Sequence, residues 1–467
     1  MRPLLVLFAA AGLFGAALQP LAATPPTALP IPAHGVIGVE ERQLNAEYWI
    51  QRQARADRVV LDAQAIAAQN ARLRELDASV HDLESLPATV TREQVRAWIA
   101  SVSERPAQAL YDERGQPIAA GVLDGLQEAL DLEAIPAQQP LRYGLIVQRA
   151  DLRAFPTPLR VFNSPDDHDI DRFQESGLFP GDPVAIVHES RDRRWWFVVS
   201  PLYTAWVEQR HVAQGEAAAV FGYGRRSPQL IVTGATARTV YTPERPQLSQ
   251  LQLDMGVRVP LLADWPPDRP VNGQHPYTAH VIELPVRGDD GRLSFAPALL
   301  PKNQDTTERY LPLTKANLLR QGFKFLGERY GWGHSYNARD CSGFVSDVYR
   351  SFGVSLPRNT RDQAVSPALN RIAFGEQDDR AARMKAVREL QVGDLIYIPG
   401  HVMMAIGERN GEPYVIHDTT GISYRDGEGR VARARLNGVS VSPLTPLLFD
   451  EAHSYVDRIT SIQRIRP

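Results

Sequence analysis

The sequence predicts a multidomain α+β protein in which a helical region and two regions of short strands precede an α-then-β region. The chain has 467 residues, which is enough for several domains at roughly 150 residues each. Hydrophobic residues make up 43% of it and charged residues 22%, a balance typical of globular proteins rather than of disordered chains. The apolar pattern then changes in kind along the chain, and each change is expected to mark a domain boundary.

Charge and cysteine content exclude several classes of function. Lys plus Arg number 51 and Asp plus Glu 54, so a net charge of -3 gives no argument for a nucleic-acid partner. The one cysteine, Cys341, excludes an internal disulfide, so stability must come from core burial. We find no signature of a metal or an organic cofactor, and we expect a monomer.

The N-terminus is typical of an exported protein. A basic start is followed by an apolar run, residues 4–18, and by the small residues that end at Ala23. This pattern predicts a secretory signal peptide over residues 1–23. The run is short for a spanning helix and leads into a Pro-rich linker, residues 24–38, so stable membrane insertion is not expected after cleavage. We expect the protein in the periplasm or cell envelope, with full secretion as the alternative.

Residues 39–141 predict a helical N-terminal domain that clasps or stabilises the rest of the chain. Apolar residues recur at intervals near the helical period from Asn45 to Ile66. Thr91 and Gln94 have the spacing of a capping box ahead of an apolar run. This region contains no obvious chemistry.

Two regions of short strands follow. Residues 142–216 alternate short apolar strands with polar turns, which predicts a small barrel, and their texture resembles a bacterial SH3-like domain. A long loop in this region contains Asp171 and Gln174 and is expected to be its binding loop. Residues 217–308 have a similar texture and predict a second SH3-like barrel.

Cys341 lies where a Gly-rich loop turns into a helix that stops at Gly353, within the last region, residues 309–467. Backbone N–H groups and the helix dipole favour a thiolate there and can hold an oxyanion. A lone cysteine is usually a small buried hydrophobe. However, an unpaired thiol in an exported chain, flanked by Asp340 and Ser342, favours a nucleophile.

Two histidines downstream complete a candidate set. A thiolate needs a base, and the base needs a group that orients it. His401 begins one predicted strand and His417 ends the next, so we interpret His401 as the general base and His417 as its orienting partner. A tight turn at Asn410-Gly411 would offset the two histidines, whereas a bulge or a longer loop would align them. Zinc binding is the competing use of one Cys and two His, but a zinc ligand needs neither a Gly-rich loop nor a helix N-terminus.

Several motifs together resemble the NlpC-type cell-wall peptidases (the NlpC/P-sixty family). They are Asp340-Cys-Ser-Gly-Phe344, Leu356-Pro-Arg-Asn-Thr360 with Gln363, Gly393-Asp-Leu395, Gly400-His-Val402 and His417. The resemblance covers residues 311–467, and the order of domains upstream is similar to that of envelope members. It implies a papain-like fold with a Cys-His-His triad on Cys341, His401 and His417. It also implies hydrolysis of the γ-D-glutamyl–diamino acid bond in peptidoglycan stem peptides or muropeptides.

The resemblance also implies roles for residues around the nucleophile. Tyr330 lies where such enzymes place a tyrosine facing the oxyanion, and Trp332 would wall the pocket. Asp340 and Ser342 match positions that bind a free substrate amine in relatives with this domain order. A carboxylate holds an ammonium group well, yet it also opposes ionisation of a neighbouring thiol and is a good helix N-cap. One departure is His334, where relatives commonly carry glycine; it is either a spectator at the cleft rim or a group that narrows the substrate range.

The first SH3-like domain is expected to close one end of the cleft, with Asp171 and Gln174 reaching it. That closure would favour fragments with a free N-terminal L-Ala over intact stems. Two other functions stay open: a non-catalytic envelope protein that binds peptidoglycan, and an amidase or acyltransferase of the same fold group. The complete set of Cys341, His401 and His417 argues against a binding protein, and the products would identify an amidase.

Overall fold

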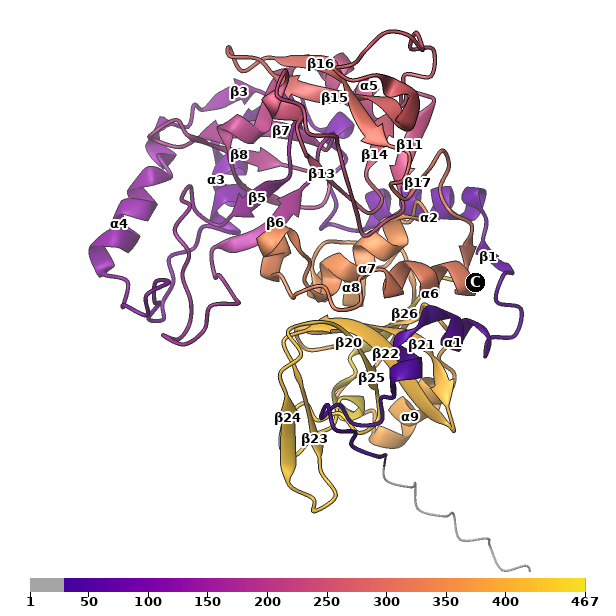
Figure 1. The fold of residues 1–467 in the computed structure, drawn as a ribbon. Helices are drawn as coiled ribbons and strands as arrows, with labels where there is room; N and C mark the ends of the chain where they lie inside the picture. The colour runs from indigo at the N-terminus through magenta and orange to yellow at the C-terminus, as the bar shows by residue number, and fades with distance from the viewer. Residues whose placement is uncertain (1–28, 467) are drawn as a thin grey trace, which may run out of the picture.

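The computed structural model describes residues 29–466. The predicted signal peptide and the first part of the predicted linker lie outside these residues. The described chain has three main parts: a C-terminal sheet, a layer of helices above it, and two strand-rich units on the other side of the helices (Figure 1). Within residues 29–466, no helix combines the length and the apolarity that a membrane crossing requires.

The C-terminal part is built on an antiparallel sheet of six strands. Its order is β19 (Asn370–Ala373), β26 (Ser461–Arg464), β20 (Leu395–Ile398), β21 (His401–Arg409), β22 (Glu412–Thr419) and β25 (Gly438–Pro443). A smaller hairpin joins β23 (Ile422–Arg425) to β24 (Val431–Ala434), and α9 (Arg380–Arg388) lies at the edge of this part. Together with the helices, the sheet forms the frame for the candidate site.

The hairpin between β21 and β22 combines a tight turn with a bulge. Asn410 and Gly411 both have positive φ, as such a turn requires, and the register shifts between Ala405 and Gly407. Beyond the bulge Met404 pairs with Ile416, so His417 falls opposite Met403, two residues from His401. Because side chains alternate along a strand, both histidines project from the same face of the sheet.

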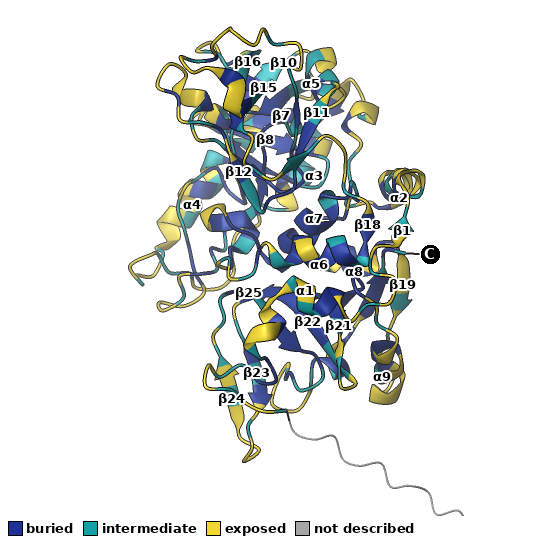
Figure 2. Ribbon diagram, turned by 45° about the vertical axis from the view of Figure 1, so that its right-hand side comes forward, coloured by how far each residue is buried: buried dark blue, intermediate teal, exposed yellow. Residues whose placement is uncertain are grey.

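Three helices cover the other face: α6 (Lys315–Phe323), α7 (Cys341–Arg350) and α8 (Thr360–Val365). The apolar stripe of α7 includes Phe344 and Val348, which are fully buried in one core with Met404 and Ile416 of the sheet. Burial of such side chains contributes roughly 1.5–3 kcal/mol each. Figure 2 shows α7 buried along most of its length, whereas α2 and α4 expose one face. The helix that begins at Cys341 is therefore held rigidly between the sheet and the upstream units.

The strands of the first strand-rich unit, for which residues 142–216 were predicted to form a small barrel, make one curved sheet. Its order is β10 (Val212–Gly215), β4 (Arg142–Ile146), β7 (Pro183–Glu189), β8 (Trp195–Val199), β9 (Thr204–Glu208), β5 (Ala150–Arg153) and β6 (Gln174–Leu178). The aromatic residues of β8 and β9 are buried in its interior. Strand β6 faces the C-terminal part and contacts the loop before Cys341.

The second strand-rich unit, residues 217–308, consists of α5 (Ala217–Tyr223) and three small sheets. The strands are β11 (Gln229–Val232), β14 (Arg258–Pro260) and β17 (Thr306–Thr307) in one sheet, β12 (Thr236–Arg238) with β13 (Gln252–Asp254), and β15 (Ala279–Arg287) with β16 (Leu293–Pro301). Strands of all three sheets contribute to a common apolar core. Its assignment as a second SH3-like barrel stays a prediction.

The region expected to be one helical domain, residues 39–141, divides between two cores. Trp49 of α1 (Ala46–Ile50) is fully buried against Tyr414 in the core of the C-terminal part. By contrast, α3 (Arg92–Ala100) and α4 (Ala120–Ala129) pack with the first strand-rich unit. These short helices have apolar faces too small to form a core of their own, so each piece completes the core of a larger neighbour. The boundary at residues 39–141 therefore stays a proposal.

The remaining N-terminal elements link these parts. The strands β1 (Val59–Leu61) and β18 (Leu313–Thr314) pair, as do β2 (Thr89–Thr91) and β3 (Gln138–Pro140). The Asn70 side chain in α2 (Ala63–Leu76) donates to the Gly353 carbonyl, just after α7. The described end of the Pro-rich segment docks on the C-terminal part, where the Tyr414 hydroxyl donates to the Gly38 carbonyl at 2.6 Å. This end is thus packed against the fold rather than a free linker.

Candidate active site

Cys341 is the first residue of α7, and its side chain is almost completely buried. The N-cap is Asp340, whose Oδ1 accepts the N–H of Gly343 at 2.8 Å. The Cys341 Sγ lies 3.6 Å from Thr360 Oγ1 at the start of α8, and the backbone N–H of Val402, at the start of β21, also interacts with the thiol. Three element ends therefore converge on the sulfur.

The surroundings of the thiol oppose its ionisation. Burial and then the neighbouring Asp340 carboxylate raise the pKa of Cys341 to about 12, against weaker opposing contributions from Thr360 and the Val402 N–H. The sequence argument from the helix N-terminus predicted a thiolate, and here it is wrong for the resting state because burial outweighs the helix end. The sulfur is a protonated thiol at neutral pH and needs a base.

His401 and His417 form a hydrogen-bonded pair, with His401 Nε2 and His417 Nδ1 2.8 Å apart. The Oγ of Ser442, on β25, lies 3.0 Å from His417 Nε2 and continues the chain. Burial lowers the pKa of His401 to about 4, and burial followed by His401 lowers the pKa of His417 well below its usual value. Both rings are thus neutral at pH 7, and His401 can accept a proton through Nδ1, which has no hydrogen bond to any residue in the range 29–466.

Ser442 was not found by sequence reasoning. The position of Ser442 follows only weakly from the sequence. Strand β25 pairs with β22 so that Ser440 lies opposite His417, and Ser442, two residues further along, projects from the same face. Only the pairing of these two strands, which are separated by another hairpin, brings Ser442 to the imidazole.

Asp340 lies at the centre of a buried polar cluster. Both of its oxygens contact Arg358, at 3.2 and 2.8 Å, and they also accept the N–H groups of Gly343 and Gly333 and the Ser342 hydroxyl. Burial alone would raise the pKa of Asp340, but Arg358 and the two N–H groups hold it below its usual value. The carboxylate is therefore ionised and its acceptor positions are largely filled. Its predicted role in binding a substrate amine stays a prediction.

Arg358 is a second residue that sequence reasoning did not single out, although it lies in the stretch Leu356-Pro-Arg-Asn-Thr360. It is buried, and its guanidinium also donates to Ser342 Oγ at 2.9 Å and to Ser176 Oγ at 2.7 Å. It therefore connects Asp340 to strand β6 of the first strand-rich unit.

Tyr330 and Trp332 flank the start of the Gly-rich loop. Tyr330 is buried, and burial followed by the nearby Cys341 and Asp340 raises its pKa well above the usual value, so its hydroxyl stays protonated. The indole Nε1 of Trp332 donates to the backbone carbonyl of Gln174 at 3.0 Å. His334 is buried with its ring 5.5 Å from Phe179, and it lies between Gly343 of α7 and Gly177 of β6 rather than at an exposed rim.

Of the two residues expected from the binding loop, the structure brings one to the site's border. The Gln174 side chain donates to the Gly333 carbonyl at 2.8 Å. Asp171 lies further back, fully buried and paired with Arg153 at 2.5 Å. Asp171 and Gln174 do line a common cavity of about 230 Å³, together with Tyr336, but Cys341 is not part of its lining.

Glu175 and Tyr203 form another polar pair at this border that was not predicted. The Tyr203 hydroxyl donates to Glu175 Oε2. Burial raises the pKa of Glu175, and Arg358 is close enough to oppose that shift. Tyr203 in turn interacts with Asn359, which is adjacent to Thr360, the partner of the thiol. The side chains of Gln174 and Ser176 on strand β6 thus contact the C-terminal part, and Glu175 between them pairs with Tyr203 of the same unit.

Within residues 29–466, no group of three or more His, Cys, Asp or Glu side chains has an arrangement that could hold a metal ion.

Comparison with known proteins defines the class to which this fold and site belong. The NlpC/P60 family matches residues 327–441, and an SH3 domain of SH3b1 type matches residues 160–208. The chain therefore contains an NlpC/P60 domain of papain-like fold together with an SH3 domain of bacterial type. NlpC/P60 family members are cysteine peptidases.

Individual relatives cover different shares of the chain. A gamma-D-glutamyl-L-lysine dipeptidyl-peptidase from Bacillus cereus is 27% identical over 221 residues, which are 44% of this chain and 55% of that protein. The chain thus spans about half the length of this curated relative. An NlpC/P60 endopeptidase from Photobacterium damselae subsp. piscicida is similar in structure, with a TM-score of 0.71 at 17% identity over 89% of this chain and 96% of the other. An NlpC/P60 family protein from Bacillus cereus has a TM-score of 0.45 at 19% identity, over 70% of this chain and all of the other.

Proposed function

We propose that this protein is a peptidoglycan endopeptidase that hydrolyses the γ-D-glutamyl–diamino acid bond of murein peptides, with Cys341 as nucleophile. The observation that carries the proposal is that the Cys341 thiol, at the start of α7, contacts the N–H of Val402 at the start of β21, directly after a neutral His401 that is linked to His417 and Ser442. The name of the Bacillus cereus relative, which specifies a γ-D-glutamyl bond to lysine, supports the bond that we propose.

The geometry suggests a base-assisted mechanism that begins from neutral partners. Nδ1 of His401 takes the thiol proton as Sγ forms a bond to the γ-glutamyl carbonyl carbon. The oxyanion would be held by the free N–H groups at the start of α7 and by the Tyr330 hydroxyl. The C–N bond then breaks, the leaving amine takes the proton from His401, and a thioester remains. Water, deprotonated by His401, attacks the thioester and releases Cys341 as the protonated thiol.

His417 and Ser442 would act through His401. A hydrogen bond from His401 Nε2–H to His417 Nδ1 fixes the tautomer in which Nδ1 of His401 is the acceptor. His417 Nε2–H then donates to Ser442 Oγ, which fixes the second ring. The first hydrogen bond thus holds the His401 ring in one orientation, and the second holds the His417 ring in one orientation.

We propose that the enzyme prefers fragments whose N-terminal L-Ala amine is free. The first strand-rich unit approaches the start of α7 through β6, and it presents the Glu175 carboxylate next to Tyr203. Only one oxygen of Glu175 is engaged by a residue of the described chain, whereas Asp340 is surrounded by donors. An ammonium group held near Glu175, with Asp340 and Ser342 behind it, would exclude stems whose amine is acylated.

The proposed substrates place the protein in the cell envelope. The predicted signal peptide supports export, and the proposed partners are released murein peptides rather than nucleic acid or membrane. We propose that the enzyme acts as a monomer and needs no cofactor.

Two peptides and one variant test this function. The substrates are L-Ala-γ-D-Glu-diaminopimelate with a free amine and the same peptide N-acetylated, each incubated with the mature reduced protein and with Cys341→Ala. We expect cleavage of the free peptide between D-Glu and diaminopimelate, and no cleavage by the variant. Equal cleavage of both peptides would overturn the amine preference. Sacculus binding without hydrolysis would instead indicate a binding protein, and products from another bond an amidase.

A further inference from the structure

The loop before Cys341, residues 331–338, has a backbone conformation that residues with side chains rarely adopt. Gly333 has φ +56°, and three residues with side chains are also left-handed: His334 at +65°, Tyr336 at +59° and Asn337 at +57°. Left-handed backbone brings Cβ too close to the following carbonyl oxygen, so each of these residues is strained. Such a conformation persists only where the surroundings hold it.

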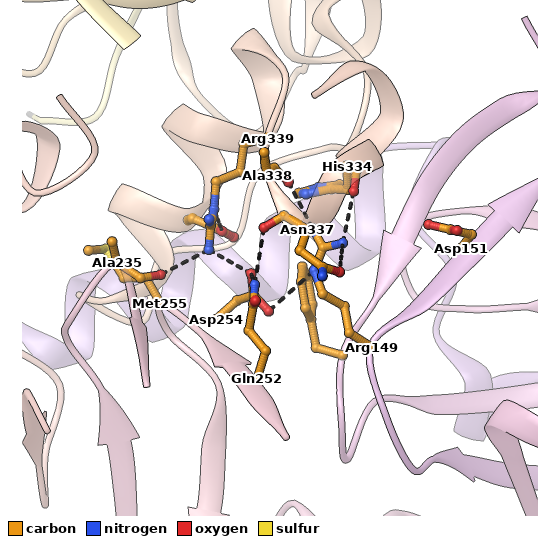
Figure 3. Close-up of polar contacts among 12 residues, drawn as sticks. Arg149, Asp151, Ala235, Gln252, Asp254, Met255, His334, Asn337, Ala338 and Arg339 are labelled. Carbon is orange, nitrogen blue, oxygen red and sulfur yellow. Dashed lines mark hydrogen bonds and ion pairs between the residues drawn. The ribbon is translucent and has the colours of Figure 1, made fainter. Parts of the chain in front are cut away.

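The side chains that stabilise this loop conformation lie outside the C-terminal part. Four backbone carbonyls of the loop each accept a hydrogen bond from a side chain of one of the two strand-rich units. Arg149 donates Nη1 to the His334 carbonyl at 2.8 Å and Nη2 to the Ala338 carbonyl at 2.7 Å. Gln252 donates to the Asn337 carbonyl at 3.1 Å, and Gln174 to the Gly333 carbonyl at 2.8 Å. Figure 3 shows the Arg149 and Gln252 side chains reaching the loop from their two units.

One buried carboxylate joins these donors to the end of the loop. Asp254, fully buried in β13, accepts Gln252 Nε2 at 3.1 Å and lies 3.4 Å from Arg149 Nε. Its Oδ1 also accepts Arg339 Nη2 at 2.6 Å (Figure 3). Arg339 directly precedes Asp340, so Asp254 links Arg149 and Gln252, two of the three side chains that hold the loop, to the residue before the helix cap.

Positive and negative charges are equal in number in the ion network around Asp254 and Arg339. Arg339 contacts Asp347 at 2.8 Å and Glu328 at 2.9 Å besides Asp254, and Arg350 pairs with Asp347 at 2.9 Å. Three guanidinium groups therefore face three carboxylates. They are Arg149, Arg339 and Arg350, and Asp254, Glu328 and Asp347. A buried ion network of this kind contributes little net stability compared with an apolar core, but removing one partner leaves a buried charge uncompensated. Its main effect is to fix geometry at the start of α7.

We propose that Arg149 and Gln252 are positioning residues for the candidate active site, and that the two strand-rich units are the support on which loop 331–338 adopts its left-handed conformation. In that conformation the Gly333 N–H reaches Asp340 Oδ2 at 3.0 Å, and the Trp332 indole donates to the Gln174 carbonyl at 3.0 Å. The effect of the loop on turnover rests on the proposed function, whereas its support by Arg149 and Gln252 does not.

Hydrogen–deuterium exchange of the full-length protein tests the support without any substrate. Four loop amides, those of Gly331, Gly333, His334 and Ala338, are hydrogen-bonded in the structure and should exchange slowly. We expect Arg149→Ala to speed exchange in peptides that cover residues 331–338 by about tenfold or more, and Gln252→Ala to speed it by a smaller factor. Arg149→Lys, which keeps the charge but not the two-pronged donor, should give an intermediate rate.

A matched control is Arg191→Ala, which removes an exposed arginine of the same unit that pairs with Glu128 at the surface. It should leave exchange of the loop unchanged. If Arg149→Ala lowered the melting temperature too far for a folded sample, Gln252→Ala, which removes the bond to the Asn337 carbonyl and deletes no charged group, would decide alone. Loop exchange equal to that of the unaltered protein in both Arg149→Ala and Gln252→Ala would overturn the proposal.

Kinetics then test the connection to the site. With the free-amine tripeptide, measured well below the melting temperature, we expect Arg149→Ala to lower kcat/KM by about 10- to 100-fold, because a small misplacement of a substrate wall is costly. The acid limb of the pH profile, which depends on His401, should not move. An unchanged kcat/KM together with faster loop exchange would overturn the positioning role but keep the support. If the unaltered protein cleaves no peptide, the proposed function fails while the exchange result still stands.

Discussion

At the scale of single residues, the candidate site combines a thiol that resists ionisation with imidazoles that resist protonation. Burial dominates both effects, since it raises the pKa of Cys341 to about 12 and lowers that of His401 to about 4. A proton transfer from sulfur to nitrogen in the resting enzyme is therefore unfavourable, and the charge separation must be stabilised as substrate binds.

The first prediction concerns pH. Protonated His401 cannot accept the thiol proton, and because its pKa is lowered, this loss begins only in acid. We expect kcat/KM on the free-amine tripeptide to stay level from pH 7 to about pH 5, and to fall about tenfold per unit below about pH 4. A pH–rate profile measures this directly. A midpoint near the usual pKa of histidine would show that the ring is more solvated than the structure indicates.

The second prediction concerns Ser442, which fixes the ring of His417 at 3.0 Å. Ser442→Ala removes one hydrogen bond worth about 0.5–1.5 kcal/mol, which corresponds to a fall in kcat of roughly 2- to 12-fold. Ser440→Ala is the matched control, because Ser440 lies on the same strand and face but bonds only to the Gly438 carbonyl. Steady-state kinetics should show the loss in Ser442→Ala alone; equal losses in both variants would point to a general effect on β25.

At the scale of elements, the start of α7 explains how much of the site the sequence could predict. This helix has an N-cap residue, an apolar stripe and a terminating glycine, and all three are patterns among neighbouring residues. The helix begins at Cys341 as expected. The two histidines were also predicted, but their alignment needed a bulge between Ala405 and Gly407 that no turn rule specifies. Arg358 and Ser442 were missed because their partners come from elements distant in sequence.

The third prediction concerns the cap itself. Asp340→Asn keeps a helix-capping side chain but removes the charge beside Cys341, so the pKa of the thiol should fall and its alkylation by iodoacetamide at pH 8 should become faster. The same change leaves Arg358 buried without its partner and should destabilise the fold by about 3 kcal/mol.

A matched control for this charge effect is Asp418→Asn. Burial and then Asp340 raise the pKa of Asp418 well above its usual value, and Asp418 contributes less than Asp340 to the raised pKa of Cys341. Alkylation as a function of pH, and urea denaturation, measure the two effects. If Asp340→Asn and Asp418→Asn changed the alkylation rate equally, the charge at Asp340 would not control the thiol.

At the scale of the whole molecule, the parts are interdependent in ways that the sequence does not indicate. The strand-rich character of residues 142–216 and 217–308 could be predicted because turn residues and the alternation of apolar and polar residues are patterns among neighbouring residues. However, Arg149 lies 185 residues from His334, and Trp49 lies still further from Tyr414. Contacts at such separations follow only from the assembled fold, which is why the N-terminal helices were predicted as one domain.

The fourth prediction concerns that dependence. Trp49 is fully buried between α6 and β22, so Trp49→Ala should leave a cavity and destabilise the C-terminal part by about 3–5 kcal/mol. Tyr277→Ala, at an exposed position of the second strand-rich unit, should change stability by no more than about 0.5 kcal/mol. Urea denaturation followed by tryptophan fluorescence compares them. A loss below about 1 kcal/mol in Trp49→Ala would mean that the N-terminal segment is dispensable for the fold around the candidate site.

The most direct measurement for the central claim is covalent labelling of the nucleophile. A diazomethyl ketone built on L-Ala-γ-D-Glu places an electrophilic carbon where the γ-carbonyl would bind, and intact mass and peptide mapping locate the adduct. The account predicts one adduct, on Cys341, which excess free-amine tripeptide suppresses and which Cys341→Ala does not form. An adduct on another residue, or undiminished peptide cleavage by Cys341→Ala, would contradict it.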